Sequence, residues 1–146
     1  MNTKYIYKND KMTYQHVYSK SYLGKIEEFK NMIEDFAESM VIIGAEQNGN
    51  IFYSIKDVTE VGVTLMEIFM PAKSFVEYDD EDIMYSSYFY MDDMLSKIIE
   101  RPEQGEASWA AISLYQQSKG IKRRSEFYHE LHLRNDKKPY ILLKTK

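Results

Sequence analysis

The sequence predicts an α+β fold in which a strand, helix, strand, strand unit occurs twice and forms an antiparallel sheet with its helices packed on one face. The first indication is an internal repeat. At an offset of 120 − 44 = 76 residues, glycine and apolar strand positions coincide as Gly120 with Gly44, Tyr128 with Phe52, and Ile141 with Leu65. The second indication is that a two-residue periodicity gives way to a helical one after each opening strand. We therefore expect one domain, with halves at about 12–76 and 83–146 joined by residues 77–82.

The first half is expected to open with a strand and continue into an amphipathic helix. Alternation from Met12 to Tyr22 indicates the strand, whereas residues 4–8 fit either a short strand or a frayed end. Gly44 lies where the following helix should stop. Apolar residues spaced by three or four mark the buried face of that helix: Ile26, Phe29, Ile33, Phe36 and Met40.

Two strands should complete the first half. Ile51–Ile55 is a short β-branched and aromatic run, and Val63–Met70 is a second one closed by Pro71, which cannot donate to a central ladder. The acidic residues crowded into 77–82 should stay solvated, which makes this segment the joint between the halves.

The second half repeats this order. Met84–Tyr90 is expected to be a strand, after which Asp92 or Asp93 could cap a short helical segment through Ile99. Residues 102–105 should break that segment, and 106–119 should form a helix ended by Gly120. Small residues predict a close-packing face on this helix, widened by Trp109 and Ile112: Ala107, Ala110, Ala111 and Leu114.

The chain should close with two strands, Ser125–Leu133 and Pro139–Thr145. The turn between them is rich in polar residues at 135–138, as a tight connection requires. Such short links between neighbouring strands are what favour antiparallel pairing.

Composition excludes several classes of protein. A net charge of −4 over 146 residues argues against a general affinity for nucleic acid, which needs clustered Lys and Arg. Cysteine is absent, so disulfides and thiolate ligands are excluded. No apolar run is long enough for a signal peptide or a membrane span, and the expected location is the cytoplasm.

No catalytic, metal or cofactor motif stands out, so we expect a protein that is not an enzyme. His129 and His132 lie three apart in a predicted strand and point to opposite faces, so they cannot bind one ion together. Phosphate-cradling glycine loops and serine nucleophile motifs are missing, and the acidic run at 77–82 lacks the ligand spacing of a calcium loop. The basic run Lys122, Arg123, Arg124 fits either an acidic partner or a solvated turn.

The aromatic residues carry the main binding signal. Aromatic side chains in strands usually belong to the core, yet the seam between two related halves is also a natural place for a ligand groove. Glu67 alternates with Leu65 and Phe69, so it is a buried acid needing a partner if that strand face points inward. The candidate ligand- or partner-binding residues are Tyr18, Tyr53, Glu67, Phe69, Tyr88, Tyr90, Trp109 and Tyr128.

These motifs resemble the gyrase-inhibitor-like, or effector-binding, superfamily. The first copy contains Tyr18–Tyr22, Gly44, Ile51–Ser54 and Glu67–Pro71, and the second runs from Tyr88 through Gly120 to Tyr140. Within that superfamily, Met84–Met94 followed by Ala107–Leu114 is similar to an uncharacterised family of small Gram-positive proteins. Members of that family tend to be encoded beside LXG-type toxins of type VII secretion loci.

The resemblance implies two functions. The narrower one implies an accessory chaperone or targeting factor that binds the helical N-terminal region of a secreted toxin, since exposed aromatic surfaces suit amphipathic helices. The broader one implies an aromatic groove for a hydrophobic cation, often with a buried glutamate; here the offset places Leu143 opposite Glu67, so the second half lacks that acid. Hydrolase activity, known in some relatives, would need a positioned acid such as Glu67. A homodimer is left open.

Overall fold

The computed structural model describes residues 5–58, 62–100, 104–132 and 139–146. These residues form two units, named here after their helices. The α1 unit is Thr13–Tyr90, and the α2 unit combines Met1–Met12 with Met91–Lys146. The acidic segment 77–82, expected as a joint, lies inside the α1 unit, in the connection between its third strand and the next one.

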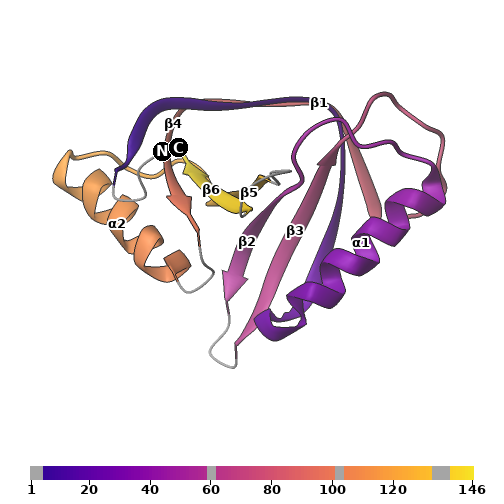
Figure 1. Ribbon diagram of the computed structural model, residues 1–146, viewed down its shortest axis with the longest axis horizontal. Coiled ribbons are helices and arrows are strands. Elements are labelled where there is room, and N and C mark those ends of the chain that lie inside the picture. Colours follow the sequence, from indigo (N-terminus) through magenta and orange to yellow (C-terminus); the bar gives the residue numbers. More distant parts are fainter. Residues whose placement is uncertain (1–4, 59–61, 101–103, 133–138) are drawn as a thin grey trace. The chain divides into compact units, whose positions relative to one another are not determined.

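The α1 unit contains residues 13–25 of strand β1 (Tyr7–Lys25), together with β2 (Phe52–Val58), β3 (Val63–Pro71) and a helical connection. β3 pairs antiparallel with both neighbours, which gives the order β1, β3, β2. A 3-10 turn (Ile26–Glu28) leads into helix α1 (Phe29–Ile43), which lies along this sheet (Figure 1).

Helix α1 covers one face of its sheet and holds it by polar and apolar contacts. The Tyr22 hydroxyl and the Lys20 ammonium both donate to Asp35 on the helix, at 2.6 and 3.0 Å. Phe36 and Met40 are buried as predicted, and Phe29 and Ile33 are half-buried. Met32, which the spacing did not predict, is buried as well. Ile26 is wrong as a buried position: it falls in the 3-10 turn and is 49% exposed.

Strand β4 (Ile83–Ile99) begins in the α1 unit and enters the α2 unit at Met91. With that second part of β4, the α2 unit repeats the topology through α2 (Gly105–Ser118), β5 (Tyr128–His132) and β6 (Tyr140–Thr145). β6 pairs antiparallel with both neighbours, so the order β4, β6, β5 matches β1, β3, β2. Both helices end at a glycine in the left-handed region, Gly44 at φ 79° and Gly120 at φ 68°. The predicted α+β fold with duplicated halves is therefore confirmed.

The helical segment expected after Asp92 is wrong. Strand β4 continues to Ile99, because Leu95–Ile99 pairs residue by residue with Ile141–Thr145. Leu95 and Ile99 join Ile112 of α2 in the core of this unit, so tertiary pairing decides the structure over local capping signals.

The predicted packing face of α2 is also wrong. Ala107, Ala110 and Leu114 are exposed, whereas the buried line is Ser108, Ile112 and Gln116. Trp109 and Ile112 lie at the core as expected, because a large ring and a branched side chain fill the space over β6 better than alanine does. Of the expected break at 102–105, residues 102 and 103 lie outside the described residues, whereas Gly105 already begins α2. The turn at 135–138 and residues 1–4 also lie outside the described residues. Among the described helices, none is long and apolar enough to cross a membrane.

Candidate functional site

Each three-stranded sheet has a face opposite its helix, here called the helix-free face. In the α1 unit this face carries two cross-strand pairs, Phe52 with Phe69 and Ser54 with Glu67. Their strand neighbours point the other way, since Tyr53 contacts Phe29 at the start of α1. The helix-free face of the α1 unit is therefore where an acid and aromatic rings come together.

Glu67 is engaged by two partners on this face. The Ser19 hydroxyl donates to Oε2 at 2.7 Å, and the Lys56 ammonium lies 2.7 Å from Oε1. The Glu67 side chain is only 16% exposed, so the predicted inward acid with a partner is confirmed. Beside it, the fully buried Ser54 hydroxyl has no hydrogen-bond partner among the described residues.

Aromatic rings flank this acid. Phe52 and Phe69 stack with their centroids 4.6 Å apart and 9° between their planes. Phe89 of β4 meets the edge of Phe52 at 5.1 Å, and Tyr14 stacks on the same ring at 5.3 Å. Such a combination of stacked rings with one carboxylate can hold a ligand that is flat, apolar and cationic.

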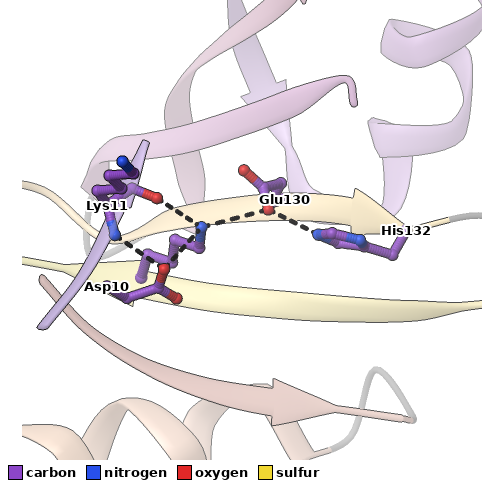
Figure 2. Close-up of polar contacts among 5 residues, drawn as sticks. Asp10, Lys11, Glu130 and His132 are labelled. Carbon is purple, nitrogen blue, oxygen red and sulfur yellow. Dashed lines mark hydrogen bonds and ion pairs between the residues drawn. The ribbon is translucent and has the colours of Figure 1, made fainter. Parts of the chain in front are cut away.

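The helix-free face of the α2 unit contains a buried ionic network (Figure 2). Lys144 donates to the backbone oxygen of Lys11 at 2.9 Å, and its Nζ lies 3.4 Å from Glu130 Oε1 and 3.6 Å from Asp10 Oδ1. His132 Nε2 lies 2.6 Å from the same oxygen of Glu130. Lys144 and Glu130 are both at least nine-tenths buried, so each needs the other to offset its desolvation.

This network stabilises charge rather than assembling a reactive group. Two carboxylates surround one ammonium, and the His132 ring stacks on Tyr140 at 4.7 Å. No group of three or more metal-ligating side chains occurs in the described part of the chain.

The pairing register changes one predicted equivalence. Ser54, paired with Glu67, corresponds at the 76-residue offset to Glu130, which pairs with Leu142. Leu142, and not Leu143, therefore takes the place of Glu67, since the paired residues are 142 − 130 = 12 positions apart in the second half and 67 − 54 = 13 apart in the first. Each unit therefore has one acid in this cross-strand pair: Glu67 on β3 in the α1 unit and Glu130 on β5 in the α2 unit.

The predicted binding residues divide among several surroundings. Tyr18 and Tyr53 are buried in the α1 unit; Tyr18 accepts a hydrogen bond from the Val76 amide at 2.7 Å, and burial raises the pKa of Tyr53 to about 12. Trp109 of α2 stacks on Phe127 at 4.7 Å and donates to His129. These three aromatic residues thus pack inside their own units.

The remaining five candidates lie on other surfaces. Glu67 and Phe69 share the helix-free face of the α1 unit, Tyr128 lies on that of the α2 unit, and Tyr88 and Tyr90 project from β4. Sequence reasoning missed Ser54, Glu130, His132 and Lys144. Strand alternation from Tyr128 would have placed Glu130 and His132 on its face, but the histidines were considered only as metal ligands.

One surface of β4 exposes large apolar side chains. Met84, Tyr88 and Tyr90 are 63%, 67% and 55% exposed, whereas Tyr85 and Phe89 between them pack inward and Ser86 and Ser87 are exposed. Among those inward residues, Tyr85 contacts Tyr18, and Phe89 contacts Phe52. We call Met84, Tyr88 and Tyr90 the β4 apolar row.

Comparison with known proteins fits this architecture. The family model of a domain of unknown function, DUF5085, matches residues 13–146. The chain belongs to the DUF5085 family. No curated protein matches this DUF5085 chain.

Two solved structures share the fold. EcmrR, from a cryo-EM structure of its complex with DNA, superposes with a TM-score of 0.74 at 10% identity; the match covers 96% of this chain and 56% of EcmrR. An uncharacterised conserved protein from Listeria innocua superposes with a TM-score of 0.60 at 10% identity, covering 95% of this chain and 91% of that one. At these identities the similarity shows the fold alone, which is gyrase-inhibitor-like.

Proposed function

We propose that this DUF5085 protein is a non-catalytic binding protein that accompanies an LXG-type toxin to type VII secretion by binding an amphipathic helix of its N-terminal region. The observation that carries this proposal is the β4 apolar row. Its members are more than half exposed, although Ile83, Tyr85 and Phe89 beside them pack inward. Clustered exposed apolar side chains are typical of surfaces that bind another protein.

The length of the row suits a helical partner. Met84 to Tyr90 spans six residue steps, or about 20 Å at the rise of a strand. A helix of about 13 residues has the same length, so an i, i+3, i+7 apolar stripe could lie along the row. The acidic residues at 77–82 precede the row and are mostly exposed, which favours basic residues beside the stripe of the partner.

Recovery of the partner tests this function. The tagged chain is purified from its native cells, and the proteins that remain bound are identified by mass spectrometry. We expect one LXG-type toxin in stoichiometric amount, and we expect Tyr88→Ser with Tyr90→Ser to lose it because both rings leave the row. Leu114→Ser, which alters an exposed apolar residue of α2, is the matched control. Recovery of the chain alone, or equal recovery with the row variant, would contradict the proposal.

A second candidate function is binding of a small hydrophobic cation at the helix-free face of the α1 unit. It is favoured by Glu67 beside the Phe52 and Phe69 stack, with the unpartnered Ser54 hydroxyl next to the acid. Glu67→Gln removes the charge and should abolish binding of a cationic dye, while leaving toxin recovery unchanged. Dye binding that survives Glu67→Gln would exclude this face.

A further inference from the structure

A surface depression lies where helix α2 ends and the chain reverses. Its volume is about 450 Å³, within the size range of small-molecule sites. It is lined by three residues of the last turns of α2 and three residues that follow the reversal: Ser113, Gln116, Gln117, Ile121, Lys122 and Arg123. None of these six side chains is acidic. The depression belongs wholly to the α2 unit and is separate from both helix-free faces.

One wall of the depression is the buried amide side chain of Gln116. Gln116 is 4% exposed, and its Nε2 makes no hydrogen bond within the described part of the chain. Helical spacing forces this burial, since Gln116 continues the line of Ser108 and Ile112 into the core. A buried amide without a partner is costly, so a ligand group that reached Gln116 would recover a hydrogen bond.

Positive charge surrounds this donor. Residues 119–124 contain four basic residues and no acid, although the whole chain carries a net charge of −4. Two of the four, Lys122 and Arg123, line the depression. The Arg123 guanidinium lies 4.8 Å above the Phe127 ring, which stacks on Trp109 in turn. Stacking holds the guanidinium plane in place, so less side-chain entropy is lost when it binds an anion.

The C-terminal end of a helix carries a partial negative charge, and at the end of α2 hydrogen bonds offset this charge. Carbonyl oxygens at a helix C-terminus repel anions when they are unpaired. The Tyr115 carbonyl accepts from the Ser118 hydroxyl at 2.8 Å, the Gln116 carbonyl from the Ile121 amide at 2.8 Å, and the Gln117 carbonyl from the Gly120 amide at 3.2 Å. These three carbonyl oxygens already accept hydrogen bonds, so the groups available to a ligand are hydrogen-bond donors and cations.

We propose that this depression binds the oxyanion group of a small ligand, either a phosphate or a carboxylate. Gln116 Nε2 and the Ser113 hydroxyl donate neutral hydrogen bonds, while Arg123 and Lys122 supply the charge. A guanidinium pairs with two oxygens of one such group at once, which fixes its orientation. This anion site does not depend on the proposed toxin binding, so refuting either proposal leaves the other unaffected.

The test is a titration of the intact chain with inorganic phosphate and, separately, citrate at constant ionic strength. Trp109 is the chain's one tryptophan and stacks on the ring beneath Arg123, so its fluorescence reports on the site. We expect a saturable change with a dissociation constant below about 1 mM for one of the two anions. The anion that binds more tightly identifies the ligand group as phosphate or carboxylate. Saturation by neither anion overturns the proposal.

Variants separate the site from general charge attraction. Arg123→Gln should weaken binding by about tenfold or more, since a charged hydrogen-bonding pair is lost. Gln116→Leu should also weaken binding, yet it should raise the melting temperature of the free protein because the unpartnered amide is gone. Lys119→Gln, which removes a charge from the same basic run outside the depression, should change affinity less than twofold, a small effect for an exposed charge. Equal effects of Arg123→Gln and Lys119→Gln would refute a specific site.

Discussion

Replacing Lys144 by methionine should destabilise the α2 unit more than any surface substitution. Methionine keeps most of the volume of lysine but removes the ammonium that lies 3.4 Å from Glu130 and 3.6 Å from Asp10. Removing one partner of a buried pair costs about 3–5 kcal/mol, because the other charge stays buried and uncompensated. Glu130 retains its contact with His132, so we expect the lower end, about 3 kcal/mol.

Urea denaturation followed by circular dichroism measures this loss. With a slope of about 2 kcal/mol per molar urea, a loss of about 3 kcal/mol lowers the midpoint by about 1.5 M. The matched control is Lys146→Met on the same terminal segment. Lys146 pairs with Asp92 at 2.8 Å, but that carboxylate is 49% exposed, so the control should lose at most about 1 kcal/mol.

A double variant checks the cause. Lys144→Met combined with Glu130→Gln removes both buried charges, so it should recover part of the stability that the single variant loses. The electrostatic reasoning is refuted if Lys144→Met unfolds at the same midpoint as Lys146→Met, or if the double variant is less stable than the single one.

Three further substitutions in the α1 unit have defined outcomes. Burial raises the pKa of Tyr53 to about 12, against about 10 in the unfolded chain. The contribution of Tyr53 to the free energy of unfolding should therefore be full below pH 10 and fall by up to about 3 kcal/mol as the pH rises to 12. Tyr53→Phe should remove this alkaline loss, as measured by urea titrations. Ser54→Ala removes a buried hydroxyl without a described partner and should raise the melting temperature by about 2–4 °C in calorimetry, so a decrease would reveal a hidden partner. Gly44→Ala forces a side chain into the left-handed region with no contact within 4 Å, so a thermal melt should show a loss of about 1–2 kcal/mol from backbone strain alone.

The sequence predicted the order of helices and strands well because the residues that end helices recur at corresponding positions in the two halves. Gly44 and Gly120 take the same left-handed conformation at corresponding helix ends, and the strands after them pair in the same order. Local patterns failed where long-range pairing decides. The capping signal at Asp92 predicted a helix, but five residue pairs between β4 and β6 hold this segment in a strand. The alanines of α2 were predicted to be buried, but the core forms around Ile112 instead.

The candidate site was predicted less well because its key contacts join distant residues. Ser19 and Glu67 are 48 positions apart, and Lys144 and Lys11 are 133 apart, so neither hydrogen bond leaves a local pattern. Position along a strand did predict that Glu67 needs a partner if its face points inward, and the structure meets that condition. Strand position could not predict that Lys56 pairs with Glu67, because a β-bulge between Ile55 and Asp57 shifts the register at that position.

The two buried acids differ in how readily they could accept a cationic ligand. At Glu130 a ligand must displace Lys144, whose side chain is 6% exposed, whereas at Glu67 it must displace Lys56, whose side chain is 36% exposed. Because Lys56 is the more exposed of the two lysines, its exchange for a ligand cation costs less than the exchange of the buried Lys144. Cation binding, if the DUF5085 chain has it, therefore belongs to the α1 unit.

Lys56→Gln tests this argument in the direction opposite to Glu67→Gln. Removing the internal competitor should tighten binding of a cationic dye by about three- to fivefold, the equivalent of about 0.6–1 kcal/mol, because Glu67 then lacks its ion-pair partner. Fluorescence titration of the dye measures the change, and Lys97→Gln on β4 of the α2 unit controls for net charge. Unchanged or weaker dye binding by Lys56→Gln would mean that Glu67 serves only to anchor Ser19 and Lys56, which leaves the exposed β4 apolar row as the binding surface of the α1 unit.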